Sequence, residues 1–396
     1  MILAADWVLP VDGPPVRGGA VSVQDGVIAE VGTGLVPDER FDGCVILPGL
    51  VNAHTHLEYA GMSGFGDGWP FDRWIADHIR RRKGLGDGDY LAQARAGAAA
   101  CLAGGVTTIA DCCYAGTVAE AAAAAGLRAI VYLELFSGHM PGETGIEERL
   151  ARLPDHPLIT PGLSPHAPYT VTLEDYERWI GLARELGLPV ATHLLESHMD
   201  EHPISYFSGV LGPDTVAIHA VRADPQDVAV LARLDVPVAH CPRSNALLGC
   251  GTAPVPELLA AGVRIGLGTD SPASALTIDM WDEMRAAVLV ARARARRPDA
   301  LIAEQVLRMA TLDGARALGL DRIGALSPGL AADLVVLDLS ATPFVPWDDP
   351  VTAAVYGGSP GGVVLTMVDG QIRYRRGQEA ADREPARAVR ARMIES

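Results

Sequence analysis

The stretch GLVNAHTHLEYAGMSG, residues 49–64, places two histidines at the end of an apolar run that begins near Val45. His54 and His56 are separated by one threonine, and residues two apart on a β-strand point to the same side. The pair can therefore act as a two-point clamp for a metal ion. Glu58 follows two residues later and puts a carboxylate beside the pair.

Working outward, short apolar runs alternate with longer stretches of helical character through the middle of the chain. The runs end near eight residues: His56, Asp111, Glu134, Ser164, His193, His219, His240 and Asp270. The helical stretches lie at 90–103, 117–125, 173–186, 225–234 and 279–296. Eight strand–helix alternations predict an α/β fold of the (β/α)8 barrel type. A doubly wound open sheet is the alternative, but the glycines at 64–68 lack the Gly-x-Gly-x-x-Gly spacing of its phosphate-binding turn.

The ends of these runs carry imidazole and carboxylate groups, and barrel enzymes build their active sites at the carboxyl ends of the strands. Several unpaired histidines buried at equivalent positions would be costly unless a metal ion binds them. We expect one divalent ion, zinc in preference to iron(II), held by His54, His56, His193 and Asp270. Such an ion brings the pKa of a bound water toward ~7 and makes it a nucleophile near neutral pH.

Three further roles follow from the same strand ends. Glu196 lies three residues after His193 and can move a proton to a substrate, although capping the next helix is an alternative role for it. His219 would face the reacting water across the barrel, and Asp270 could take the proton of that water. His240 precedes a turn-like segment at 241–245, where it either reaches the site or only anchors the loop.

The amino-acid composition argues against nucleic-acid binding, a disulfide framework and a membrane span. The formal net charge of −17 argues against a nucleic-acid partner, because such partners require a basic surface. The basic run Arg80–Lys83 is too short to reverse this and reads as a solvated helix end. Six cysteines without a Cys-x-x-Cys pair indicate reduced, buried thiols. The absence of a long apolar run or a basic leader favours a cytoplasmic protein without a membrane span.

Two competing motifs fail on physical grounds. Gly357–Gly361 matches Gly-x-Ser-x-Gly, but the oxyanion hole there needs the backbone N–H after the serine, and Pro360 has none. His56-Leu57-Glu58 matches the His-x-Glu of zinc cytidine deaminases, but the accompanying Pro-Cys-x-x-Cys is absent.

The two flanks of the chain resemble each other. Residues 1–46 and 322–375 contain short alternating runs broken by Gly, Pro and Asp, which predict short antiparallel strands. The tail after Arg373 is polar and rich in Arg and Glu, and it is expected to be a surface helix or a frayed end.

In this order and spacing, the motifs resemble those of the amidohydrolase superfamily over nearly the whole chain. Residues 49–56 are similar to its first-strand motif, 193–197 to its fifth-strand histidine and glutamate, 218–220 to its sixth-strand histidine, and 268–271 to its eighth-strand aspartate. The resemblance implies a metal-dependent barrel at 49–320. It also implies a small β-sandwich built from both termini, at 1–48 and 321–396.

The resemblance points to the branch that uses one metal ion. Two-metal members bridge their ions with a carboxylated strand lysine, whereas the only lysine here, Lys83, lies in the basic helix-like run. Residues 164–170 and 240–245 resemble deaminases of adenosine-like compounds and the related chlorotriazine hydrolases. In those proteins the equivalent of His166 contacts the substrate.

Two more residues are candidates for contact with the substrate. The sequence of residues 52–58 resembles aminofutalosine deaminases of the alternative menaquinone route more than methylthioadenosine/S-adenosylhomocysteine deaminases, many of which carry an apolar residue in place of Glu58. Glu58 would then hold a ribose hydroxyl, or else orient a metal-bound histidine. Trp69 would stack on the purine, or else pack within a lid loop.

We therefore expect a hydrolytic deaminase that replaces the amine of a 6-aminopurine nucleoside with oxygen and releases ammonia. Aminofutalosine is the first candidate substrate, followed by methylthioadenosine, S-adenosylhomocysteine and adenosine. Hydrolysis of a chlorotriazine or a cyclic amide on the same fold, and a non-catalytic scaffold, are the alternatives. The expected partner is a small-molecule nucleoside, with no nucleic acid and no membrane, and a homodimer is one option for the assembly.

Overall fold

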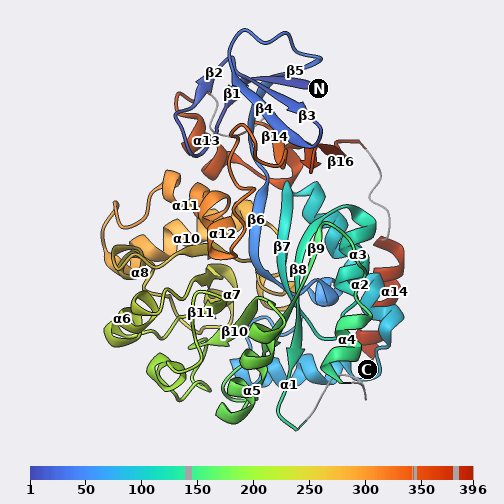
Figure 1. The fold of residues 1–396 in the computed structure, drawn as a ribbon, viewed down its shortest axis with the longest axis vertical. Helices are drawn as coiled ribbons and strands as arrows, with labels where there is room; N and C mark the ends of the chain where they lie inside the picture. Colours follow the sequence, from blue (N-terminus) through green and yellow to red (C-terminus); the bar gives the residue numbers. More distant parts are fainter. Residues whose placement is uncertain (139–144, 341, 343–345, 378–382, 396) are drawn as a thin grey trace.

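The computed structural model describes residues 1–138, 145–340, 342, 346–377 and 383–395. Within these residues, eight parallel strands follow one another in chain order around a barrel (Figure 1). The strands are β6 (Leu50–Thr55), β7 (Val106–Cys113), β8 (Arg128–Leu135), β9 (Ile159–Pro165), β10 (Val190–Leu194), β11 (Thr215–His219), β12 (Val238–His240) and β13 (Ile265–Leu267). The predicted (β/α)8 barrel is confirmed.

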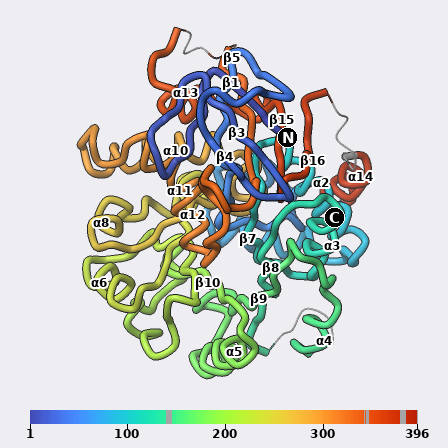
Figure 2. The backbone as a smooth tube through the Cα atoms, turned by 45° about the horizontal axis from the view of Figure 1, so that its top comes forward, coloured from blue at the N-terminus to red at the C-terminus, as the bar shows by residue number. Residues whose placement is uncertain are grey.

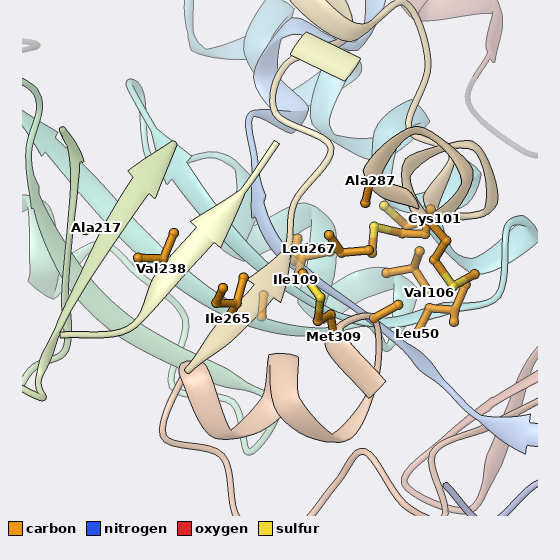
Figure 3. Packing of buried hydrophobic residues seen from close by; sticks show 14 of the residues in the cluster. Leu50, Cys101, Val106, Ile109, Ala217, Val238, Ile265, Leu267, Ala287 and Met309 are labelled. Carbon is orange, nitrogen blue, oxygen red and sulfur yellow. The ribbon is translucent and has the colours of Figure 1, made fainter. Parts of the chain in front are cut away.

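The barrel strands are continuous apolar runs because both of their faces are covered. Every residue of β7, for example, is buried. In Figure 3, Leu50, Val106 and Ile109 of the barrel lie in one cluster with Ala287 and Met309 of the surrounding helices. This packing fixes the strands, and with them the side chains at their carboxyl ends.

Side chains close the seam between the first and last strands. The amide of Asn52 donates from Nδ2 to Thr269 Oγ1 at 2.8 Å, and the backbone N–H of Thr269 donates back to Asn52 Oδ1 at 2.9 Å. One step further along, the N–H of Asp270 donates to the carbonyl oxygen of His54 at 2.9 Å. The seam therefore holds two of the predicted metal ligands next to each other.

The helices cover the outside of the barrel, and the five expected from the sequence are present with ends shifted by no more than three residues. None of the described helices is both long and apolar enough to cross a membrane. The helices are α1 (Phe71–Arg82), α2 (Asp87–Ala103), α3 (Val118–Ala125), α4 (Ile146–Ala151), α5 (Leu173–Glu185), α6 (Pro225–Arg233), α7 (Pro242–Leu247), α8 (Val255–Ala260), α9 (Pro272–Ala275), α10 (Met280–Ala295), α11 (Ala303–Met309), α12 (Leu312–Ala317), α13 (Pro350–Gly357) and α14 (Arg383–Glu395), with 3-10 turns η1 (Leu57–Met62), η2 (Ile204–Phe207) and η3 (Pro360–Gly362).

Both ends of the chain build a second, mixed sheet at one end of the molecule (Figure 1). Its strands are β1 (Ile2–Val8), β2 (Val16–Arg17), β3 (Ala20–Gln24), β4 (Val27–Gly32), β5 (Glu39–Pro48), β14 (Leu334–Asp338), β15 (Val363–Val368) and β16 (Gln371–Arg375). The expectation of antiparallel pairing needs one correction, because β1 pairs with β5 in parallel. The long connection through β3 and β4 returns the chain to the same end of the sheet, which makes parallel pairing possible.

The tail forms a surface helix, α14, and not a frayed end. Val389 and Met393 are buried, and the helix lies beside α2 in both views (Figures 1 and 2). Arg390 donates from Nη1 to the carbonyl oxygens of Gly61 and Ser63, at 2.5 and 2.8 Å. The C-terminal helix thereby holds η1, the turn that follows the two histidines of the first barrel strand.

Candidate active site

The carboxyl ends of the barrel strands bring the four predicted metal ligands together. The ring centroid of His54 lies 4.7 Å from that of His56 and 5.0 Å from that of His193. Asp270 Oδ1 lies 3.4 Å from His54 Nε2 and 3.5 Å from His56 Nε2. All four side chains are buried.

The hydrogen bonds around these histidines fit a bound cation. His56 Nδ1 lies 2.6 Å from the carbonyl oxygen of Cys112, and His193 Nδ1 lies 2.8 Å from that of His166. Each Nδ1 must donate to its carbonyl, so the lone pair of each Nε2 is free for a metal ion. His54 Nε2 is buried without a hydrogen-bond partner among the described residues. Burying an unpaired polar nitrogen costs free energy unless the nitrogen coordinates an ion. Three imidazoles and a carboxylate suit a divalent ion such as zinc.

The surroundings of Asp270 fix its carboxylate for this role. The Ser244 and Ser274 hydroxyls donate to Oδ2 at 2.5 and 3.0 Å, and the backbone N–H of Ser271 donates to Oδ1 at 2.6 Å. Burial works to raise the pKa of Asp270, but the close approach of His54 Nε2 and the other nearby imidazoles hold it well below its usual value. Asp270 is therefore ionised and oriented.

Glu196 and His219 form the second part of the site. Glu196 Oε1 lies 3.5 Å from His219 Nε2, and both side chains are buried. Burial, with the charges of Asp270 and Asp200 adding to it, raises the pKa of Glu196 well above its usual value, so that this carboxyl can hold a proton. Burial lowers the pKa of His219 to about 3. Asn245 Nδ2 lies 3.0 Å from His219 Nδ1 and donates to it, so the neutral ring carries its proton on Nε2, toward Glu196.

The backbone is strained where the strands deliver these side chains. Leu195, His219, Ala220 and Asp270 have φ values of +53°, +77°, +50° and +59°. Such left-handed residues cost of order 1–3 kcal/mol each and gather at functional sites. Strict alternation along β11 would point His219 to the same side as Ala217, away from the barrel interior, and the positive φ turns the ring into the site instead.

A cavity of about 310 Å³ opens above these groups. It is lined by His56, His193, Glu196, His219 and Asp270, by the aromatic residues Tyr59, Phe71, Trp74, Phe136 and Tyr169, and by Ile75, His78, Ile79, Arg82, Glu134, His166, Thr170, Met199 and Ser271. The cavity therefore joins the charged groups at the strand ends to an aromatic wall that can hold a flat heterocycle.

Of the predicted substrate contacts, His166 lines the cavity, whereas Trp69 and Glu58 do not line it among the described residues. The guanidinium carbon of Arg73 lies 4.0 Å from the ring centroid of Trp69, so this indole packs in the loop before α1. His166 Nδ1 is 2.7 Å from Thr170 Oγ1, and its ring centroid is 4.8 Å from that of Phe136, which fixes the imidazole at the cavity wall.

The partners of Glu58 differ from both predicted ones, which were a ribose hydroxyl of the substrate and a metal-bound histidine. Its carboxylate accepts hydrogen bonds from the backbone N–H groups of Ala115 and Thr117, at 2.9 and 3.0 Å, and from the Thr117 hydroxyl at 2.8 Å. Cys113 Sγ lies 2.9 Å from Oε1. The carboxylate therefore holds the loop after β7. Among the described residues it does not line the cavity, and it makes no hydrogen bond to a proposed ligand histidine.

His240 is fully buried, and neither ring nitrogen has a hydrogen-bond partner among the described residues. It does not line the cavity. Among the described residues, His240 therefore neither reaches the cavity nor anchors the loop at 241–245 through a ring hydrogen bond.

Sequence reasoning missed several residues of the site. Ser244 and Asn245 follow His240 in the first turn of α7, so proximity along the chain to a strand end was the available signal. Glu134 is the penultimate residue of β8, and its carboxylate is an alternative to Asp270 as a partner of His56 and His193. The ligand atoms of Glu134, His56 and His193 lie within 4.8 Å of one another. Its position near the end of a strand indicated that Glu134 lies close to the site, but whether it can bind a metal ion depends on the direction of its side chain.

The barrel, the terminal sheet and the cluster of histidines with an aspartate define a class of metal-dependent hydrolase. Residues 45–373 match the Amidohydrolase family, and the chain belongs to this family. Curated relatives cover nearly the whole chain. A 5′-deoxyadenosine deaminase of Methanothermobacter thermautotrophicus is 36% identical over 93% of this chain and 92% of its own length. A 5-methylthioadenosine/S-adenosylhomocysteine deaminase of Syntrophobacter fumaroxidans is 37% identical over 91% of this chain and 89% of its own length.

Solved structures agree with this assignment. An adenosine deaminase from Xanthomonas campestris with bound zinc is similar over 100% of this chain and 98% of its own, with a TM-score of 0.93 and 30% identity. An atrazine chlorohydrolase from Arthrobacter aurescens with zinc has a TM-score of 0.87 over 99% of both chains, but at 22% identity it supports the fold alone. The chain is an enzyme of the hydrolytic deaminase type within the amidohydrolase family.

Proposed function

We propose that the chain is a zinc-dependent deaminase of a 6-aminopurine nucleoside derivative, with aminofutalosine as the first candidate substrate. The observation that carries the proposal is the pair Glu196 and His219, which stands beside Asp270 at the base of an aromatic cavity. A proton donor, a neutral hydrogen-bond donor and a carboxylate base are the three groups that hydrolytic loss of an amine needs.

The residues divide the proton transfers among them. A divalent ion bound at His54, His56, His193 and Asp270 would supply a water of lowered pKa near the substrate. Asp270 accepts a proton from the water whose oxygen adds to the ring carbon bearing the amine. Glu196 donates its proton to the adjacent ring nitrogen, and His219 donates a hydrogen bond from Nε2 to the added oxygen. The proton on Asp270 then passes to the leaving amine, and the proton that remains on the added oxygen passes to Glu196. Both carboxyl groups are thereby restored, and water and aminopurine become oxopurine and ammonia.

The wall of the cavity suits a flat heterocycle with a polar edge. The rings of Phe136 and Tyr169 lie beside His166, with centroids 4.8 and 5.6 Å from that of the imidazole, and Trp74 of α1 also lines the cavity. Burial lowers the pKa of His166 to about 3, so a neutral imidazole faces the substrate. Such a ring can exchange a hydrogen bond with a purine nitrogen without placing a charge against it.

Methylthioadenosine, S-adenosylhomocysteine, 5′-deoxyadenosine and adenosine form the second group of candidate substrates. They share the aminopurine with aminofutalosine and differ in the 5′ substituent, and the names of the relatives favour them. The chemistry at the purine is the same for all of them, so they test one reaction with different 5′ groups.

The test is a substrate panel with the zinc-loaded protein. Ammonia release is measured with aminofutalosine, the four nucleosides above and a chlorotriazine, and E196Q serves as the control that keeps the four proposed metal ligands. We expect release from at least one aminopurine and none from E196Q above background. If every aminopurine is left intact by a protein that carries its metal ion, the proposal is wrong.

A further inference from the structure

One face of helix α1 forms a wall of the cavity. Phe71, Trp74, Ile75, His78 and Arg82 recur at spacings of three, four and seven residues and all line it. These spacings place side chains on one face of a helix. Arg82, the third residue of the basic run, therefore turns toward the cavity, whereas Arg80 is exposed to solvent.

The three arginines of this run have different partners. Arg80 pairs with Asp77 at 2.6 Å, and Arg81 pairs with the same carboxylate. Arg82 instead donates from Nη1 to the hydroxyl of Tyr59 at 3.1 Å, and its guanidinium carbon lies 4.3 Å from the ring centroid of Tyr114. Among the described residues, no carboxylate lies within ion-pairing distance of Arg82, although a guanidinium always carries its charge.

The strand order places Arg82 across the cavity from the reacting groups. Its partner Tyr114 directly follows β7, whereas Glu196 and His219 stand at the ends of β10 and β11. In the barrel, β7 is separated from β10 by β8 and β9. A nucleoside whose purine amine meets Glu196 and His219 would extend its 5′ end toward the side on which Arg82 stands.

We propose that Arg82 binds a carboxylate carried by the 5′ substituent of the substrate. This inference rests on the proposed deaminase function and adds the chemical class of the substrate. The planar fork of a guanidinium matches a carboxylate in a bidentate pair. Tyr59 and Tyr114 hold the Arg82 side chain from two sides, so little further ordering is needed when the substrate binds.

The rival role for Arg82 is to balance the charge of Glu134, which lines the same cavity. In that case Arg82 would serve every substrate equally, because the balance is needed whether or not the ligand is charged. The two roles separate when a charged and an uncharged substrate of the same shape are compared, and when Glu134 is neutralised as well.

The matched probes are 5′-carboxymethylthio-5′-deoxyadenosine and its methyl ester, which differ in the charge at the end of the 5′ substituent. Deamination is followed with the zinc-loaded protein, and the dissociation constants of both probes are measured by calorimetry. We expect the parent protein to favour the acid over the ester by roughly 10- to 100-fold in kcat/KM, the range that hydrogen bonds between charged groups give.

R82M should lose this preference because its KM for the acid rises, whereas its kcat/KM for the ester should change less than threefold. R82K should keep part of the preference. R80M is the control on the solvent side of the same run.

Each outcome bears on one statement. Equal use of acid and ester by the parent, with the ester deaminated, overturns the inference and leaves the deaminase proposal intact. An equal loss of both probes in R82M that is restored in the double variant R82M/E134Q assigns Arg82 to charge balance and also overturns it. Failure of the parent to bind or deaminate either probe, together with a silent substrate panel, overturns the deaminase proposal and this inference with it.

Discussion

Replacing Glu58 by glutamine tests whether this buried carboxylate serves the loop after β7 or the substrate. In E58Q one carboxylate oxygen becomes an amide nitrogen, which cannot accept the hydrogen bond from Ala115 or from Thr117. A hydrogen bond to a charged group contributes about 1.5–3 kcal/mol, and the stranded N–H lies in a region with little water. We expect E58Q to lower the free energy of unfolding by about 1.5–3 kcal/mol, and Glu58→Ala by about 3–5 kcal/mol.

Two measurements check this expectation. Urea unfolding of the zinc-loaded protein gives the loss in stability from the shift of the midpoint. Hydrogen exchange then locates it, because the amides of Ala115 and Thr117 should exchange roughly tenfold to a hundredfold faster in E58Q, which corresponds to the same free energy. Glu120→Gln is the matched control, since Glu120 lies on α3 in an exposed pair with Arg95 and should change stability by less than about 0.5 kcal/mol.

One combination of results for E58Q would contradict the loop-anchoring role of Glu58. If E58Q unfolds at the same urea concentration as the parent, leaves the 115–117 amides as protected as before, and raises KM for the nucleoside, then Glu58 contacts the substrate and the loop does not depend on it.

The remaining predictions concern chemistry, metal binding and pH. E196Q should lower kcat by about 10²–10⁴-fold with unchanged zinc content by elemental analysis, because only the proton donor is lost; a large loss of zinc would contradict this. S244A should weaken zinc binding about 10- to 100-fold in a chelator competition, since it removes one of the two hydroxyl groups that hold Asp270 Oδ2; unchanged affinity would refute the anchoring role. Burial tends to raise the pKa of Asp214, but the hydrogen bond and charge of Arg184 leave it lowered, so this pair stabilises the fold above the usual pKa and its contribution is lost as pH falls. The stability difference between R184M and the parent should therefore shrink below about pH 4, and a constant difference from pH 3 to pH 7 would exclude the ion pair as its source.

The sequence predicted the barrel and the four residues that converge at its mouth because both depend on local pattern. Each strand is a continuous apolar run, and parallel strands all end at the same edge. His54, His193 and Asp270 are therefore neighbours in space once the strand order is known, although they lie far apart in the chain. The helix ends followed from the same alternation.

The sequence could not predict contacts that depend on side-chain direction or on long-range pairing. The sequence alone predicts that Arg82 is exposed to solvent. Which face of α1 carries it depends on the residue at which the helix begins, because a shift of one residue turns a side chain by about 100° around the helix axis. Glu58 could be assigned to a substrate or to a ligand histidine, but its actual partners belong to a loop more than fifty residues later. The parallel pairing of β1 with β5 likewise depends on how the intervening hairpin folds back.

The seam between the first and last barrel strands has a consequence for how the protein is made. Asn52 and Thr269, which are hydrogen-bonded across it, are 217 residues apart in the chain, and proposed metal ligands lie on both sides of the seam. A ribosome adds about 5–20 residues per second, so roughly 10–45 s pass between synthesis of the two sides. During that time the nascent chain exposes an open edge and lacks Asp270, and until residue 193 has been made it also lacks His193. The proposed metal site can therefore be completed only after the last barrel strand has been made, and chaperones that shield the open edge should raise the yield of active enzyme more than extra metal during synthesis.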